Sequence, residues 1–259
     1  MKPARISALL EPFLESPLSA SQLDQISIYI DLLKRWNARI NLTAIRGEEE
    51  IVTRHFGESL FMAQHLFPGP AKNCHPERSS RFAERETAAE SKACPEPSRR
   101  APYASSIPEP REGVLITPPS PPRVLDIGSG AGFPALPLKL WAPTIDLTLI
   151  ESNQKKATFL REVARALTLT NVNVIAARAE TVSASADVVT LRAVERFETI
   201  LPQATTFLAP NGRLALLIGA SQLPHLATIK LIDWSGPMHI PESQSRVLSI
   251  GIRHKSGQK

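Results

Sequence analysis

Three glycines at alternate positions are the residues of this chain best suited to hold a ligand. They are Gly128, Gly130 and Gly132, and they follow the apolar run from Val124 to Ile127. Glycine lets the backbone adopt positive φ and come close to a bound molecule. The turn opens into a predicted helix, whose free N–H groups favour negative charge. The pattern predicts a nucleotide-like ligand at the carboxyl end of a sheet.

The spacing of the glycines distinguishes two kinds of adenosine cofactor. A dinucleotide fingerprint is G-x-G-x-x-G, and its last position falls on Phe133 when it is read from Gly128. Read from Gly130, the last position is Ala135, and alanine is a permitted variant there. The form D-x-G-x-G-x-G, which begins at Asp126, instead resembles the S-adenosylmethionine loop of class I methyltransferases.

An acidic residue at the end of the next apolar segment supports an adenosine cofactor. Glu151 stands 23 residues after Gly128. A carboxylate at that place can accept hydrogen bonds from both ribose hydroxyls, as in dinucleotide folds. Acidic residues also end strands on many protein surfaces, so it is the combination with the glycine loop that predicts the cofactor.

Alternating strands and helices are expected to position these residues. We expect strands at 124–127, 147–150, 172–175, 187–191 and 213–218, a final strand at 246–253, and helices closing at Trp141, spanning 154–167 and running through 200–207. The dipeptide Asn211-Gly212 predicts a turn before the fifth strand. Such alternation implies a parallel sheet with helices on both faces.

Composition divides the chain into three parts. The pattern of residues 1–67 predicts a helical region. One helix is capped by Ser19 or Ser21 and ends near Trp36 or Asn37, and another extends from Glu48 to a break at Pro68. Residues 68–122 hold 12 of the 23 prolines and show no apolar period, which predicts a disordered insertion. Residues 123–259 form the predicted cofactor-binding domain.

Charge and cysteine content narrow the class of protein. The 259 residues carry a formal charge of +5, a modest excess that favours polyanionic partners such as RNA. Both cysteines, Cys74 and Cys94, lie in the insertion without CxxC spacing, so no metal site is expected. The longest apolar run, 214–220, is far below the roughly 18 residues of a membrane span. We therefore expect a cytoplasmic protein without a membrane segment.

Several separated motifs, in a consistent order, resemble one family. The chain is similar to the bacterial 16S ribosomal RNA guanine-N7 methyltransferases, first named glucose-inhibited division protein B. The motifs are Trp36-Asn37, Asn41 to Ile45, Arg54-His55, Glu58 to Leu60, Val124 to Pro134, Glu151-Ser152, Lys155-Lys156, Phe159-Leu160, Ala177 to Glu180 and Arg192 to Val194. The resemblance covers essentially all of the chain outside 68–122.

This resemblance implies an α/β fold, the Rossmann-like sheet of class I S-adenosylmethionine-dependent methyltransferases, with an N-terminal helical region. It also implies cofactor contacts from Gly128 and Phe133, from Ala179-Glu180 and from Arg192, whose charge would hold the methionine carboxylate or an RNA phosphate. The implied partner is 16S rRNA or the 30S ribosomal particle, bound by a monomer. At Ala135 the sequence departs from the Phe-Pro-Gly of the family.

The residue types present also narrow the range of nucleobase atoms that the protein could methylate. Methylation of pyrimidine C5 needs a cysteine, and both cysteines lie in the insertion. Methylation of amino groups usually uses an Asn/Asp-Pro-Pro-aromatic element after the fourth strand, where Arg192-Ala193-Val194 stands. Guanine N7 has a lone pair and no proton to remove, so N7 chemistry needs no general base. No catalytic acid or base is assigned, and His55 is expected to have a packing or hydrogen-bonding role.

Two other functions remain open at this level: a small-molecule methyltransferase, and a cofactor-binding or ribosome-assembly protein without activity. The insertion could also have inactivated the enzyme. Basic residues outside the motifs would contact phosphates or form a solvated basic face. They are Lys34, Arg35, Arg39, Arg46 and Arg54 in the helical region, and Arg246, Arg253 and Lys255 near the end.

Overall fold

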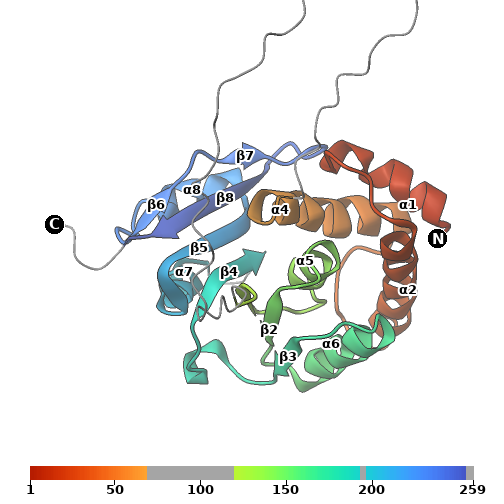
Figure 1. Ribbon diagram of the computed structural model, residues 1–259, viewed down its shortest axis with the longest axis horizontal. Coiled ribbons are helices and arrows are strands. Elements are labelled where there is room, and N and C mark those ends of the chain that lie inside the picture. Colours follow the sequence, from red (N-terminus) through yellow and green to blue (C-terminus); the bar gives the residue numbers. More distant parts are fainter. Residues whose placement is uncertain (69–119, 193–196, 255–259) are drawn as a thin grey trace, which may run out of the picture. The chain divides into compact units, whose positions relative to one another are not determined.

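The computed structural model describes residues 1–68, 120–192 and 197–254. These residues belong to one compact unit, formed by Met1–Gly69 and Ser120–Lys259 (Figure 1). The expected insertion, apart from its first residue and its last three, lies outside the described residues, as do both cysteines, Ala193, Val194 and Lys255. Among the described helices, none is long and apolar enough to cross a membrane.

A single twisted sheet occupies the middle of the unit. Its strands are β1 (Arg123–Ile127), β2 (Asp146–Ile150), β3 (Val172–Ile175), β4 (Ala186–Arg192), β5 (Leu208–Gly219), β6 (Ile232–Trp234), β7 (Met238–His239) and β8 (Arg246–Arg253). The order is β3-β2-β1-β4-β5-β8-β6, with β7 pairing to β8. Strands β1 to β5 are parallel, as expected, and β6, β7 and β8 are antiparallel additions. This is the α/β sheet that the sequence predicts.

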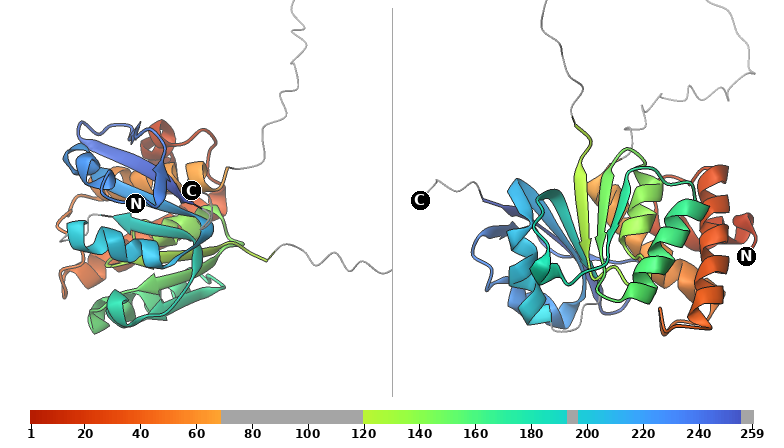
Figure 2. Two further views of the ribbon diagram at one scale, coloured as in Figure 1. Left: turned by 90° about the vertical axis from the view of Figure 1, so that its left-hand side faces the viewer. Right: turned by 90° about the horizontal axis from the view of Figure 1, so that it is seen from below.

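Helices cover both faces of the sheet (Figure 2). One face packs against α2 (Ala20–Asn37), α4 (Glu58–Leu66), α5 (Ala135–Trp141) and α6 (Gln154–Ala166). The other face packs against α7 (Phe197–Thr206) and α8 (Leu223–Leu226). Alternate residues of one strand point to the two faces, as with Val188 and Val189 of β4, which belong to different core clusters. Near-continuous burial along β4 is typical of a parallel sheet covered on both sides.

The N-terminal helices complete one of these two cores. The helix α2 begins at a capping box in which Ser19 accepts a hydrogen bond from Gln22, so the predicted cap and the predicted end at Asn37 are confirmed. The predicted helix from Glu48 is confirmed in its span, but it is α3 (Glu48–Glu50), a π-helix (Ile51–Gly57) and α4 in succession. A first helix, α1 (Pro3–Leu10), followed by a 3-10 turn (Glu11–Phe13), was not predicted.

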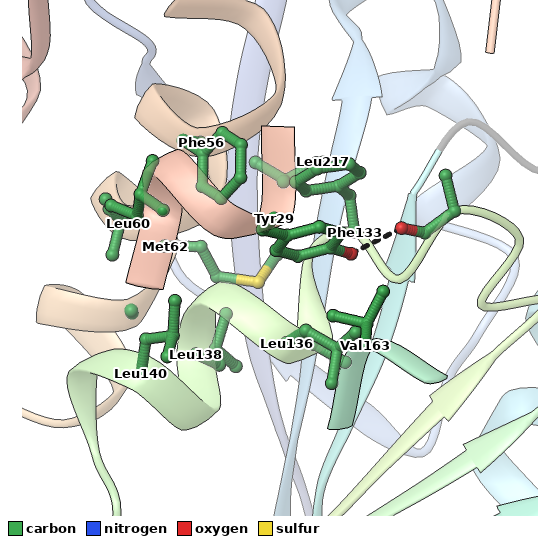
Figure 3. Packing of buried hydrophobic residues seen from close by; sticks show 14 of the residues in the cluster. Tyr29, Phe56, Leu60, Met62, Phe133, Leu136, Leu138, Leu140, Val163 and Leu217 are labelled. Carbon is green, nitrogen blue, oxygen red and sulfur yellow. Dashed lines mark hydrogen bonds between the residues drawn. The ribbon is translucent and has the colours of Figure 1, made fainter. Parts of the chain in front are cut away.

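Tyr29 lies at the centre of this core. Its ring stacks on Phe133 at a centroid distance of 5.2 Å and meets the edge of Phe56 at the same distance. Its hydroxyl donates a hydrogen bond of 2.5 Å to the carbonyl of Ala131 in the glycine loop (Figure 3). The helical region is therefore bonded directly to the loop that follows β1.

The predicted bounds of β5 differ from the structure. The strand was expected to begin at Arg213, after a turn at Asn211-Gly212, yet it already pairs with β4 at Leu208. Residues 209–212 form an irregularity between two paired segments, and Asn211 there has a positive φ of 62°. The predicted turn is therefore present as an irregularity within β5, because the chain before it already pairs with β4.

Candidate functional site

The glycine loop connects β1 to α5 and is bonded to the end of β2. The N–H groups of Gly128 and Ser129 both donate to the carbonyl of Ile150, at 2.9 and 3.1 Å. The φ angles of Gly128, Gly130 and Gly132 are 69°, 52° and 86°, all in the left-handed region. The loop therefore needs the glycines for its conformation, as the sequence predicts.

The three glycines have different surroundings. A Cβ on Gly130 would meet only the carbonyl of Gly128, at 3.7 Å, so this side of the loop is open. A Cβ on Gly132 would lie 2.3 Å from the hydroxyl of Tyr29 and 2.6 Å from Leu136. Gly132 therefore permits close packing of the loop against α2, and it lies on the protein side of the loop.

Two cavities meet at Gly128. The first, which we call the β3 cavity, has a volume of about 430 Å³ and lies at the carboxyl ends of β1, β2 and β3. Its lining residues are Ile127, Gly128, Ile150, Ser152, Ala177, Arg178, Ala179, Glu180 and Ile200. It brings the predicted residues Ala179 and Glu180 to the same space as the glycine loop.

The second cavity, which we call the arginine cavity, has a volume of about 340 Å³ and lies between the glycine loop and the N-terminal helical region. Its lining residues are Leu42, Thr43, Ile45, Arg54, His55, Gly128, Ser129, Gly130, Ala131, Phe133, Lys156, Arg192 and Arg246. It unites the predicted residues Gly128, Gly130, Phe133 and Arg192. Gly132 and Glu151 are absent from both of these linings.

The carboxylate of Glu151 supports the glycine loop by hydrogen bonding. Its carboxylate is 6% exposed and accepts hydrogen bonds of 2.8 Å from the N–H groups of Gly130 and Asn153. The side chain of Asn153 in turn caps α6 by accepting from Lys155 and Lys156. The predicted acidic residue is thus in contact with the glycine loop, and its carboxylate already takes part in local bonding.

Phe133 forms part of an aromatic stack. Its ring is stacked with His55 at 4.6 Å and with Tyr29 at 5.2 Å, and it is 6% exposed. The neighbouring Ala135, which stands where the family has glycine, is the fully buried first residue of α5. Its methyl group belongs to the core cluster.

His55 is held neutral in a fixed tautomer. Arg192 Nη1 donates to its Nδ1 at 2.8 Å, so the proton lies on Nε2, which is 2.8 Å from Thr43 Oγ1 and donates to it. Burial, followed by the charges of Arg192, Arg54 and Arg246, lowers the pKa of His55 to about 2. The predicted hydrogen-bonding role of His55 is confirmed.

Arg192 is tied to the helical region by a buried carboxylate. Its Nη2 donates to the carbonyl of Arg54 at 2.6 Å and to Glu58 Oε2 at 3.1 Å, and its side chain is 7% exposed. Burial lowers the pKa of Arg192 to about 10, so the guanidinium stays charged at neutral pH. Arg246 Nε on β8 also lies 3.1 Å from Glu58 Oε2.

Two residues of this site were not singled out by sequence reasoning. Glu58 was noted only within a motif, although a charged residue on the apolar face of a predicted helix is a signal of pairing. Asp126 is 1% exposed at the end of β1, where its Oδ1 accepts from Thr190 and its Oδ2 has no hydrogen-bond partner among the described residues. Burial raises the pKa of Asp126 to about 7. The sequence signal for a special role of Asp126 is the presence of a carboxylate within an otherwise apolar predicted strand.

The arrangement suits a ligand with an apolar or aromatic part and an anionic part. The β3 cavity offers backbone groups and a carboxylate, whereas the arginine cavity offers three guanidinium groups and Lys156. His55, the nearest base, has both ring nitrogens engaged. Across the described chain, no three His, Cys, Asp or Glu side chains gather in a group that could hold a metal ion.

Known proteins match this chain in sequence, and solved structures match part of it. The crystal structure of M. jannaschii TYW2 in complex with AdoMet has a TM-score of 0.45 and 21% identity, and the match covers 52% of this chain and 70% of that one. The ribosomal RNA small subunit methyltransferase G of Chloroflexus aggregans is 32% identical over 248 residues, covering 90% of this chain and 83% of the relative. The Roseiflexus sp. strain RS-1 protein of the same name is 34% identical, covering 90% and 84%.

A family model gives the same assignment across both parts of the unit. The model described as GidB, rRNA small subunit methyltransferase G, matches residues 22–72 and 114–231. These ranges contain α2 from its third residue onward, the π-helix, α4 and strands β1 to β5. The chain therefore belongs to the GidB family of rRNA small subunit methyltransferases G.

Proposed function

We propose that this chain transfers a methyl group from S-adenosylmethionine to N7 of a guanine in the 16S rRNA of the small ribosomal subunit. The observation that carries this proposal is the family match, which extends over the N-terminal helices as well as the sheet. The small-subunit methyltransferases at 32% and 34% identity support the same activity.

The two cavities support the cofactor. An adenosine has room in the β3 cavity, with the backbone of Ala179 and Glu180 at the adenine edge. Glu151 would serve the cofactor by accepting a hydrogen bond from the N–H of Gly130 and so holding the glycine loop in place. Gly128 and Gly130 let the backbone approach the ligand where the cavities meet. Phe133 and Arg192 would serve the methionine end, and Gly132 would serve by packing the loop.

Methyl transfer to guanine N7 requires mainly that the protein positions the two reacting groups. S-adenosylmethionine supplies an electrophilic methyl group on its sulfonium. The protein must hold a guanine so that N7 faces that group in line, which lowers the barrier by proximity and orientation. N7 carries a lone pair and no proton, so the engagement of both His55 nitrogens in hydrogen bonds is compatible with the reaction.

Basic residues near the arginine cavity support an RNA substrate. Arg35, Arg39 and Arg46 are exposed at the end of α2 and in the loop that follows it, and this loop continues into the cavity wall at Leu42, Thr43 and Ile45. Arginine in such positions contacts phosphate groups. Arg253, by contrast, donates to the carbonyl of Leu208 and serves the sheet.

Mass mapping of 16S rRNA from wild-type and gene-deletion cells tests the function. We expect one N7-methylguanine to be lost in the deletion strain and restored by the gene. A small-molecule methyltransferase would leave every rRNA methyl group in place. A binding or assembly protein would bind the particle in vitro without transferring label from S-adenosylmethionine, and either result would refute the proposal.

A loop variant tests the cofactor site. Gly128→Asp places a charge and a side chain where the two cavities meet, at a residue with φ of 69°, so binding of S-adenosylmethionine should be lost in isothermal titration calorimetry. Gly236→Asp is the matched control, because a Cβ there has no neighbour within 4 Å. Equal affinity of the two variants would contradict the assignment of the loop.

A further inference from the structure

The carboxylate of Glu58 is buried behind the arginine cavity, in contact with three arginines of its wall, although nothing in the reaction requires a carboxylate there. The side chain is 1% exposed and comes from the first turn of α4, directly after the π-helix. Its Oε2 is 3.1 Å from a nitrogen of Arg192 and 3.1 Å from a nitrogen of Arg246. Its Oε1 is 3.3 Å from Arg54 Nε. A single carboxylate thus joins three guanidinium groups from three different elements.

Glu58 Oε2 lies between the guanidinium groups of Arg192 and Arg246, which would otherwise repel each other. Arg192 on β4 and Arg246 on β8 are brought together only by the tertiary structure, and both lower the pKa of His55 by their charge. Arg246 depends most on Glu58, since its buried Nε and Nη2 have no hydrogen-bond partner among the described residues. The ion pair with Glu58 therefore holds the Arg246 guanidinium beside Arg192.

The charge balance of the cluster leaves an excess for a ligand. Three guanidinium groups contact Glu58, and Glu50 also pairs with Arg54 at 3.6 Å. Because His55 is neutral, three positive charges against two negative ones leave one positive charge uncompensated. Lys156 adds a cation to the wall of the same cavity. A partly closed cavity with excess positive charge fits an oxyanion, and guanidinium groups bind carboxylate and phosphate oxygens alike.

We propose that Glu58 is a positioning residue, whose buried carboxylate holds Arg192 and Arg246 in the geometry that binds a substrate oxyanion in the arginine cavity. This inference rests on the proposed function, in which the oxyanion has two sources: the carboxylate of the cofactor and a phosphodiester of the RNA. Glu58 acts through the arginines and does not itself touch the substrate.

The variant Glu58→Gln separates positioning from simple electrostatics. It raises the formal net charge of the protein by one unit from +5, and charge alone would then strengthen the binding of an anion. Positioning predicts the opposite, because a neutral amide pairs more weakly with guanidinium groups and its NH2 end cannot accept a hydrogen bond from any of them. We expect the dissociation constant of the affected ligand to rise about tenfold or more, as misplaced binding groups commonly cause.

Glu49→Gln is the matched control. It makes the same change of charge in the same segment, but Glu49 is exposed and pairs with Arg5, away from both cavities. It should bind both ligands as the wild type does, or slightly more tightly. Glu58→Asp is the second variant in case Glu58→Gln does not fold. It keeps the charge and withdraws the shared oxygen by one methylene, so a purely electrostatic role predicts no change and positioning predicts weaker binding.

Two measurements on the full chain identify the source of the oxyanion. The first is the ratio of affinities for S-adenosylmethionine and its decarboxylated analogue, which falls in the Glu58 variants if the arginines hold the carboxylate. The second is the salt dependence of binding to a 16S rRNA fragment, whose slope falls by about 0.7 to 0.9 for each phosphate group that the protein ceases to neutralise. A merely structural role would weaken the binding of S-adenosylmethionine and of its decarboxylated analogue equally, and it would leave the slope of the salt dependence unchanged.

The inference is overturned if Glu58→Gln and Glu58→Asp bind like Glu49→Gln in both measurements, or if both nucleosides weaken equally with an unchanged slope. A fall in the ratio of affinities supports the inference and identifies the oxyanion as the cofactor carboxylate. A fall in the slope of the salt dependence supports it and identifies the oxyanion as an RNA phosphate. Failure of the proposed function is distinguishable, because then the wild type and Glu49→Gln would themselves leave small-subunit rRNA unmethylated.

Discussion

Asp126 and His55 are buried ionisable residues on either side of the glycine loop, and burial shifts both toward their neutral forms. The pKa of Asp126 rises to about 7 because burial disfavours its charge, and the hydrogen bond from Thr190 offsets only part of this effect. The pKa of His55 falls to about 2 for the same main reason. The two residues therefore affect the pH dependence of stability in opposite directions.

Asp126 gives a prediction about stability and pH. Its pKa in the folded protein is raised to about 7, above the ~4 of an unfolded chain. The stability it contributes is therefore fully present below about pH 4 and is lost as the pH rises through about 7.

The variant Asp126→Asn has no carboxyl group at this position and should not show this loss. The free energy of unfolding of the variant, relative to that of the wild type, should therefore be higher at about pH 7.5 than at about pH 4.5. Urea unfolding of the cofactor-free proteins at both pH values measures the difference, and parallel behaviour would contradict the shift.

At the scale of elements, the glycine loop is held by the contact between α2 and the start of α5. Tyr29 donates to the carbonyl of Ala131, and its ring packs on Phe133, which itself stacks on His55 of the π-helix. Gly132 makes this approach feasible, because any side chain would meet Tyr29. The helical region thus forms part of the support of the cofactor loop.

Gly132→Ala should destabilise the protein through this contact. Its Cβ would lie 2.3 Å from the Tyr29 hydroxyl, at a residue with φ of 86°. Overpacking and an unfavourable φ together should lower the free energy of unfolding by about 2 kcal/mol or more. Adding Tyr29→Phe removes the clashing oxygen and should recover part of the loss, whereas Gly236→Ala should cost little. Urea denaturation of the four proteins decides whether the clash is real.

At the scale of the whole molecule, one core cluster joins residues of 1–68 to residues of 120–254, and the other is formed by residues of 120–254. The chain on each side of 69–119 is anchored within this unit. The carbonyl of Phe67 accepts from Trp141 Nε1 and the carbonyl of Leu66 accepts from Arg213 Nη1, each at 2.8 Å. On the other side, Arg123 pairs with Asp187 at 3.1 Å. These contacts define the fold without the intervening segment.

We therefore predict that residues 70–119 can be replaced without loss of the fold. A Gly/Ser linker of about ten residues would join the ends flexibly. The variant should keep its cooperative unfolding transition, its affinity for S-adenosylmethionine and its activity on 16S rRNA. Loss of activity with an intact transition would instead show that the segment contributes to substrate binding, and would contradict its interpretation as a passive insertion.

The sequence by itself determined the features that depend on neighbouring residues. The glycine loop after an apolar strand, the acidic end of β2, the cap at Ser19 and the succession of β1 to β5 along the chain follow from local pattern, because turns, caps and strand periods involve residues close in the chain. Only the tertiary structure decided which residues meet. The antiparallel pairing of β8, the contact of Gly132 with Tyr29, and the cluster around Glu58 join segments far apart in sequence. Such contacts are set by packing and charge pairing across space, and no local pattern specifies them.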